Sequence, residues 1–237
     1  MHSVTKRSTG LREEVLRGIR EYGMIPRGAR VLLALSGGKD SLTLLHLLAG
    51  FREILEFDLA AAHVETDTGC GEGVADRVLQ GVCDGLGVHL YRQSFPILAE
   101  AGDKLSCFYC AMRRRASLFS LAVDEGFGTL AFGHHLDDMA ETLVMNAVFH
   151  GNLSTMTPKV TFFDGALTVC RPLVFIRESR LAEYVLNLGL STAVCGCPYS
   201  SDNVRAAIKD WLYMADQVEP GVPERLYGAM RALGGRA

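Results

Sequence analysis

The residue types that could do chemistry gather first in the stretch SGGKDS at residues 36–41. This stretch separates the apolar run VLLAL from a leucine-rich helical pattern, so its glycines leave several backbone N–H groups uncapped where a strand passes into a helix. Such a junction binds anions, because the N–H groups point the same way. Lys39 and Ser41 add an ammonium and a hydroxyl group, but the spacing G-x-x-x-x-G-K-S/T of the nucleotide-triphosphatase loop is absent. We therefore expect a phosphate-binding loop of another kind, with an ordinary tight turn as the alternative.

Cysteines are the second group with chemical potential. The sequence has seven, at Cys70, Cys83, Cys107, Cys110, Cys170, Cys195 and Cys197. No secretion signal is recognisable, so we do not expect a disulfide framework, and metal or sulfur chemistry becomes the leading interpretation. The two-residue gap between Cys107 and Cys110 lets two thiolates hold one centre, and the late pair offers a further ligand. A zinc staple, a redox pair or buried thiols are the alternatives.

Carboxylates and histidines form a third group, in the segment GHHLDD at residues 133–138. Carboxylate oxygens suit Mg²⁺, so Asp138 and Asp40 are candidate ligands. Each has a structural alternative, because Asp40 could cap the helix that follows and DMAE at residues 138–141 has the spacing of a capping box. His134 and His135 could equally be hydrogen-bonded turn residues.

Apolar periodicity indicates the elements that hold these residues. Strands are expected at residues 31–35, 57–64, 88–95, 129–132 and 167–174, and helices at about 10–22, from the loop to 55, and at 74–86, 111–124 and 137–148. This order predicts an α/β fold with a doubly wound, mostly parallel five-stranded sheet and a helical C-terminal portion. Ligands in such sheets bind beyond the carboxyl ends of the strands, where the SGGKDS stretch falls. We expect a basic helical segment at residues 1–30, an α/β core at 31–175, and a helical segment with the late cysteines at 176–237.

Composition excludes several classes of protein. The 237 residues are 49% hydrophobic and 22% charged, which fits a packed globular domain and argues against disorder. No apolar stretch reaches the roughly 18 residues that a membrane span needs, so we expect a cytoplasmic protein without membrane contact. The formal charge of -3 does not indicate a nucleic-acid binder, although the first thirty residues are locally basic.

Taken together, the motifs resemble a known family. SGGKDS matches every fixed position of the SGGxDS signature of the PP-loop ATP pyrophosphatases, which cleave ATP between its alpha and beta phosphates. That loop, the CxxC at residues 107–110, GHHLDD, RPL at residues 171–173 and a late cysteine follow the order and approximate spacing of the tRNA 2-thiocytidine synthetase family. The resemblance runs from about residue 10 to residue 216 and includes Arg205.

The resemblance implies roles for individual residues. It assigns nucleotide binding to Ser36, Gly37, Gly38, Ser41, His63, Val64 and Gly133, and catalysis to Lys39, Asp40 and Asp138. The two aspartates would hold Mg²⁺ near the phosphates of ATP. A [4Fe-4S] cluster would be held by Cys107, Cys110 and one late cysteine. The family usually spaces its late pair C-x-x-C, so Cys195 and Cys197 are both candidates; Cys197 is preferred, because aligning it keeps Arg205 in register.

The implied activity is ATP-dependent thiolation of tRNA, in which a pyrimidine carbonyl oxygen is adenylated and then replaced by sulfur. The resemblance further implies a homodimer and leaves the sulfur donor open. If tRNA is the partner, the basic N-terminal segment and Arg113 to Arg115 should form one positive path to the cluster. Two other functions stay open: a PP-loop enzyme acting on a small molecule, which the low net charge favours, and a zinc-stapled nucleotide-binding protein without catalysis.

Overall fold

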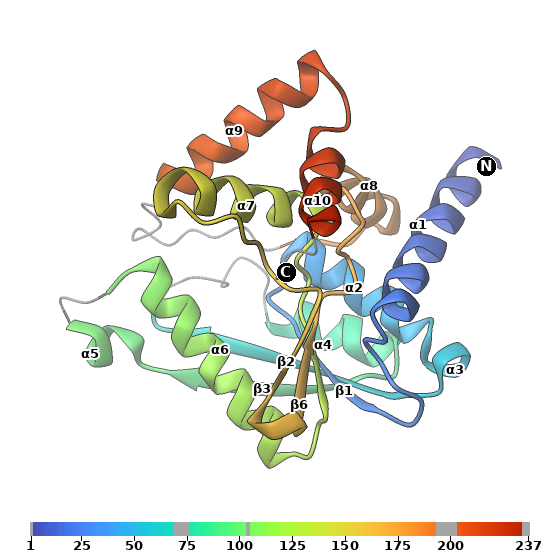
Figure 1. Ribbon diagram of the computed structural model, residues 1–237. Helices are drawn as coiled ribbons and strands as arrows, with labels where there is room; N and C mark the ends of the chain where they lie inside the picture. Colours follow the sequence, from blue (N-terminus) through green and yellow to red (C-terminus); the bar gives the residue numbers. More distant parts are fainter. Residues whose placement is uncertain (1, 69–75, 103–104, 193–202, 234–237) are drawn as a thin grey trace.

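The computed structural model of the protein describes residues 2–68, 76–102, 105–192 and 203–233, and it is drawn in Figure 1. The strands are β1 (Arg30–Ala34), β2 (Asp58–Thr66), β3 (His89–Phe95), β4 (Thr129–Ala131), β5 (Lys159–Phe162) and β6 (Leu167–Cys170). The helices are α1 (His2–Glu21), α2 (Lys39–Ala49), α3 (Arg52–Leu55), α4 (Asp76–Gly85), α5 (Ile97–Ala101), α6 (Cys107–Asp124), α7 (Leu136–His150), α8 (Glu178–Leu188), α9 (Asn203–Val218) and α10 (Val222–Ala232), with a short 3-10 turn η2 (Phe163–Gly165).

The strands form one sheet in the order β3-β2-β1-β4-β6-β5. All neighbouring strands run parallel except β5 and β6, which pair as an antiparallel hairpin. The expected α/β class with a mostly parallel sheet is confirmed. The expected number of strands was wrong, because the described residues form six strands rather than five. The missed strand, β5, has only four residues, none fully buried, so it lacks the apolar run that marks the other strands.

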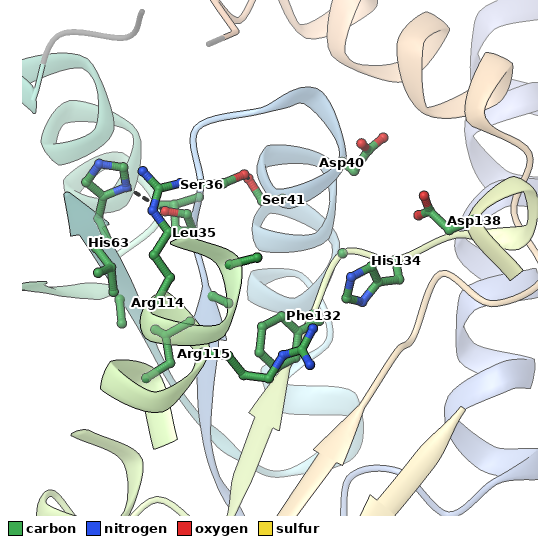
Figure 2. A pocket seen from close by; sticks show the side chains of 16 residues that line it. Leu35, Ser36, Asp40, Ser41, His63, Arg114, Arg115, Phe132, His134 and Asp138 are labelled. Atoms are coloured by element: carbon green, nitrogen blue, oxygen red, sulfur yellow. Dashed lines mark hydrogen bonds between the residues drawn. The ribbon is translucent and has the colours of Figure 1, made fainter. Parts of the chain in front are cut away.

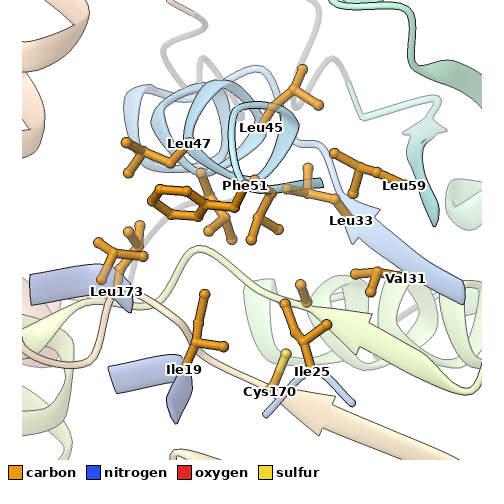
Figure 3. Packing of buried hydrophobic residues seen from close by; sticks show 14 of the residues in the cluster. Ile19, Ile25, Val31, Leu33, Leu45, Leu47, Phe51, Leu59, Cys170 and Leu173 are labelled. Carbon is orange, nitrogen blue, oxygen red and sulfur yellow. The ribbon is translucent and has the colours of Figure 1, made fainter. Parts of the chain in front are cut away.

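Helices cover both faces of the sheet. Along β1, Val31 and Leu33 pack into the larger core with α1 and α2, part of which is drawn in Figure 3. Leu32, between them, packs instead with Leu118 and Leu121 of α6. Side chains alternate across a strand, so α1 and α6 lie against opposite faces. The described arginines of α1 and the arginines of α6 therefore do not make the single positive path that we expected.

Ion pairs of Arg177, which lies just before α8, link the C-terminal helices α9 and α10 to α7. Its guanidinium contacts Asp137 of α7 at 3.0 Å, Asp216 of α9 at 2.9 Å and Glu224 of α10 at 3.0 Å. Figure 1 shows α7, α9 and α10 grouped above the sheet. Because α7 follows β4 directly, this group is positioned beside the carboxyl ends of the central strands.

Candidate functional site

A cavity of about 370 Å³ opens at the carboxyl ends of β1, β2 and β4. The strand order reverses direction between β1 and β4, and this switch point is where parallel α/β sheets usually bind ligands. Figure 2 shows Asp40 and Asp138 toward one end of the cavity and His63 toward the other. The lining residues are Ala34, Leu35, Ser36, Asp40, Ser41, Ala62, His63, Val64, Ala111, Arg114, Arg115, Leu118, Phe132, Gly133, His134 and Asp138.

The SGGKDS stretch forms the tight passage from β1 into α2. Gly37 has a φ of 81°, in the left-handed region where glycine is unstrained, and Gly38 is the residue that precedes the helix. The hydroxyl groups of Ser36 and Ser41 lie 3.1 Å apart, and Ser41 also bonds to the carbonyl oxygen of Gly38 at 3.0 Å. No side chain caps the start of α2, so its first N–H groups are available to a ligand. The alternative role of Asp40 as the helix cap is wrong, because Gly38 holds that position.

Gly133 brings the loop after β4 against the start of α2. A Cβ atom added at Gly133 would lie 3.1 Å from both the carbonyl carbon of Asp40 and the backbone nitrogen of Ser41. A contact this short would require the backbone of α2 to shift by a few tenths of an ångström, so glycine suits the position best. Gly133 therefore sets the distance between the SGGKDS loop and the residues that lead into α7.

Asp40 and Asp138 converge on the same histidine. Nε2 of His135 lies 3.9 Å from Oδ1 of Asp40 and 3.5 Å from Oδ2 of Asp138. Oδ1 of Asp40 is buried and has no hydrogen-bond partner among the residues that the structure describes. An unpaired buried carboxylate oxygen is costly, so this atom fits a site completed by a cation.

A capping box starts α7, but not at the predicted residues. His135 is the cap; its ring accepts a hydrogen bond from the backbone of Asp138, whose carboxylate bonds back to the N–H of His135 at 2.9 Å. The predicted box between Asp138 and Glu141 is therefore wrong by three residues. Asp138 combines this capping role with a place in the cavity lining. Arg205 of α9 lies 3.6 Å from Asp138 and 3.3 Å from Glu141. Burial and the charge of Asp138 raise the pKa of Glu141 to about 7.

Lys39 does not line the cavity. Its ammonium group pairs with Glu178 of α8 at 2.9 Å and with Asp40 at 3.1 Å. Burial alone would lower the pKa of Lys39, but the hydrogen bonds and charges of these two carboxylates raise it, so the side chain is a cation. The predicted contact of Lys39 with phosphate stays a prediction.

His134 is held as a neutral ring. Burial and the nearby guanidinium groups of Arg171 and Arg115 outweigh the attraction of Asp138 and lower the pKa of His134 to about 4. The ring stacks on Phe132 with centroids 5.6 Å apart, and its Nδ1 accepts a hydrogen bond from Nε of Arg171 at 3.3 Å. With Nδ1 occupied as an acceptor, Nε2 carries the proton and can donate to an oxygen in the cavity.

The three arginines after the CxxC point in different directions. Arg113 pairs with Glu100 at 2.6 Å, away from the cavity. Arg114 and Arg115 line the cavity, and Figure 2 shows Arg114 reaching toward Leu35 and His63. His63 itself is buried, with Nδ1 placed 2.7 Å from the carbonyl oxygen of Leu35. The pair of arginines gives this wall of the cavity a positive charge.

The CxxC occupies the first turn of α6. Cys110 is buried beside Ile97 and Ala101, Cys107 is half-buried, and Ser106 caps the helix. Cys70, Cys195 and Cys197 lie outside the described residues, and within the described residues no group of three metal-ligating side chains forms. Burial raises the pKa of Cys83 to about 11 and that of Cys170 to about 12, so these two are the inert buried thiols that the sequence left as an alternative.

Comparison with known proteins decides the family. The PP-loop domain model matches residues 11–210. The chain belongs to the PP-loop family. The tRNA-cytidine(32) 2-sulfurtransferase of Shewanella pealeana is 35% identical over 96% of this chain and 75% of its own, and that of Shewanella frigidimarina is 35% identical over 98% and 75%. The resemblance to the tRNA 2-thiocytidine synthetase group and the expectation of an enzyme are thereby confirmed.

Solved structures support the PP-loop fold. The U34-tRNA thiolase NcsA from Methanococcus maripaludis, solved with its [4Fe-4S] cluster, superposes with a TM-score of 0.82 over 97% of this chain and 80% of its own, at 22% identity. An NMN synthetase from Francisella tularensis gives 0.53 over 95% and 93%, at 16% identity. None of the described helices is long and apolar enough to cross a membrane.

Within the PP-loop site, sequence reasoning missed several neighbours. Phe132 and Leu118 line the cavity, and Glu178 pairs with Lys39. Arg114 was already a candidate, among the three arginines that follow the CxxC, and it lines the cavity. A local signal existed for Phe132, which directly precedes Gly133. For Glu178 there was none, because its partner is far away in the sequence.

Proposed function

We propose that the protein is an ATP-dependent tRNA sulfurtransferase that activates a pyrimidine carbonyl group as an adenylate and replaces its oxygen with sulfur. One observation carries the proposal: α6 bears the CxxC on its first turn and, one turn later, lines the cavity that the PP-loop borders. ATP activation and thiolate chemistry therefore meet at one site. The names of the relatives supply tRNA as the substrate class.

The chain supplies the groups that ATP cleavage needs. The uncapped N–H groups at the start of α2, with Ser36 and Ser41, would bind the leaving pyrophosphate. Arg114 would add positive charge as negative charge moves onto the phosphates. The orphaned oxygen of Asp40, together with Asp138, fits Mg²⁺, which would neutralise phosphate charge when bound.

The first turn of α6 also suits a [4Fe-4S] cluster. Cys107 and Cys110 lie on one turn at the positively polarised end of the helix, and their thiolates would be two of its ligands. The third would come from the late pair, with Cys197 preferred over Cys195. When bound, the cluster would carry sulfur to the activated base.

The chemistry balances without a further reactant when sulfide is the donor. The carbonyl oxygen of the base attacks the alpha phosphate of ATP, and pyrophosphate leaves. Sulfur then attacks the carbon of that carbonyl group, and the original oxygen departs as part of AMP. A carbonyl oxygen is a poor leaving group, whereas AMP is a good one, so the adenylate makes the exchange possible. Because tRNA is the substrate, the reaction belongs in the cytoplasm, and the expected homodimer stays a prediction.

Product analysis tests the proposal. Anaerobically reconstituted protein is given ATP, sulfide and tRNA, and we expect AMP, pyrophosphate and thionucleoside in equal amounts. Formation of ADP, or of AMP at an unchanged rate without tRNA, would overturn it. Release of AMP and pyrophosphate with a small acceptor in place of tRNA would support the small-molecule alternative that the mildly acidic charge favours.

Metal analysis tests the cluster separately. Wild-type protein should contain about four irons per chain with matching sulfide, and Cys110→Ala should lose them because a thiolate ligand is gone. Cys83→Ala, which removes another buried thiol, is the matched control and should keep its iron. Stoichiometric zinc in place of iron would instead indicate the zinc-stapled protein.

A further inference from the structure

Phe108 lies between the two cysteines and is unusually open to solvent. The residue is 80% exposed, although it stands on the first turn of α6 beside Cys107. Met112, one turn further, is 45% exposed. A single exposed apolar side chain needs no explanation, but these two form the outer edge of the turn that carries the thiols.

The exposed side chains lead from the thiols to the rim of the cavity. With about 3.6 residues per turn, positions 108, 112 and 115 fall within about 60° of one another around the helix axis. Arg115 is exposed and also lines the cavity, so it stands where the outer face of α6 meets the pocket. Ala111 and Arg114, on the adjoining face, belong to the cavity wall.

The charge of this edge is positive and incompletely balanced. Arg115 has no ion pair within the described part of the chain, whereas Arg113 is occupied by Glu100 at 2.6 Å. No acidic residue occurs in α6 before Asp124. Burial, followed by the charge of the nearby Arg115, lowers the pKa of Arg171, so two cations lie close together at this rim. An anionic occupant is therefore favoured over a purely apolar one.

We propose that Phe108 is a stacking platform for an unpaired base of the RNA substrate, and that Arg115 contacts a neighbouring phosphate. The inference deepens the proposed function and rests on it. Recognition of unpaired RNA combines aromatic rings that stack on bases with arginines that contact the backbone. A base on Phe108 lies beside Cys107, so the loop that carries the target base is placed over the thiols while its backbone passes the cavity.

Substitutions at Phe108 separate stacking from simple hydrophobic contact. Binding is measured with a tRNA transcript and with a stem-loop RNA carrying fluorescent 2-aminopurine beside a loop cytidine. Phe108→Ala and Phe108→Leu should weaken binding about fivefold to 100-fold and remove the quenching of the fluorophore, because base stacking is lost. Phe108→Trp should retain both. Phe149→Ala, at an exposed phenylalanine of α7, is the matched control and should bind like wild type.

The contact of Arg115 with phosphate is tested by the salt dependence of RNA binding. Arg115→Gln should reduce the slope of log affinity against log salt concentration by about one, as expected for one lost phosphate contact. ATP affinity and iron content are measured in each variant, because Arg115 borders the nucleotide cavity and Phe108 borders the cysteines. Arg20→Gln, on α1 against the other face of the sheet, should leave the slope unchanged.

The outcomes distinguish this inference from the function beneath it. If wild-type protein binds and thiolates tRNA but Phe108→Leu behaves like wild type, stacking is overturned and the proposed function stands. Equal affinity of Phe108→Ala for tRNA, with slower sulfur transfer only when a protein donor replaces sulfide, would reassign the face to a protein partner and also overturn the inference. If wild-type protein neither binds nor thiolates tRNA, the proposed function itself fails.

Discussion

Asp40 has one carboxylate oxygen that no described residue contacts through a hydrogen bond. This atom, Oδ1, is buried, and leaving such a polar atom unpaired costs about 1–3 kcal/mol or more for a charged group. We expect Asp40→Asn to lose at least about 100-fold in ATP-dependent turnover while its melting temperature changes little, since loss of the ion pair with Lys39 is offset by removal of charge from a half-buried position. Steady-state AMP release and thermal unfolding check both. Turnover near the wild-type rate would remove Asp40 from catalysis.

Gly133 is a second residue whose role can be isolated. In Gly133→Ala the new methyl group meets the backbone of Asp40 and Ser41 at 3.1 Å, so the SGGKDS loop must move. Overpacking of this kind costs about 1–3 kcal/mol, and we expect lower stability together with weaker ATP binding. Gly128→Ala, just before the first residue of β4, is the control, because no described atom lies within 4 Å of the added Cβ. Equal ATP affinity in both variants would contradict a positioning role for Gly133.

At this scale the sequence predicted motifs well and contacts poorly. SGGKDS and the CxxC are contiguous, so their residue types and spacing are visible in the chain itself. The partner of Lys39 was not predictable, because Glu178 reaches it only through the packing of α8 beside α2. The start of α7 was predicted to within one residue, but its capping box was misplaced, since a histidine rather than an aspartate supplies the cap.

Among the elements, α8 is tied to the PP-loop by one carboxylate. Glu178 pairs with Lys39 at 2.9 Å and with Lys209 of α9 at 2.7 Å. Burial alone would raise the pKa of Glu178, but the hydrogen bonds from these two lysines outweigh it and lower the pKa to about 2. The carboxylate therefore stabilises the folded protein above its ordinary pKa of 4.5, and this contribution is lost as pH falls toward 2.

The corresponding prediction is a change in the pH dependence of unfolding. Between about pH 5 and pH 3 the free energy of unfolding of the wild type should fall by about 1–3 kcal/mol more than that of Glu178→Gln. Chemical denaturation at several pH values measures this difference. Glu219→Gln, at a side chain 77% exposed, serves as the control and should follow the wild type. Parallel pH profiles for wild type and Glu178→Gln would contradict the coupling of α8 to the loop.

The elements themselves followed from periodicity wherever strands were buried. β1, β2 and β4 lie within about two residues of their predicted bounds, because central parallel strands read as apolar runs. β3 lies at the edge of the sheet and also matches its prediction within two residues. β6 ends at Cys170, four residues early, since Arg171 to Val174 turn away from the sheet. β5 lies at the edge of the sheet, and its last two residues are exposed. Neither alternation nor an apolar run therefore indicated a strand there.

In the whole molecule, the two faces of the sheet carry different features. One face carries the large core with α1 and α2, and several arginines of α1 are used there: Arg12 lies over Phe51 and Arg17 over Phe175. The other face carries α6, with the thiols, the arginines of the cavity and the exposed Phe108. Substrate RNA is therefore expected to approach the cavity along α6 rather than across α1. Sequence alone missed this division, because the charge of a segment does not tell which face it covers.

Nucleoside mass spectrometry of tRNA tests the central claim most directly. The tRNA is isolated from cells that lack the gene and from the same cells supplied with wild-type protein, Asp40→Asn or Cys110→Ala. The account predicts that a thiolated pyrimidine disappears on deletion, returns with the wild-type protein, and stays absent with either variant, since one lacks a PP-loop carboxylate and the other a cluster ligand. An unchanged set of thionucleosides in the deletion cells would contradict it.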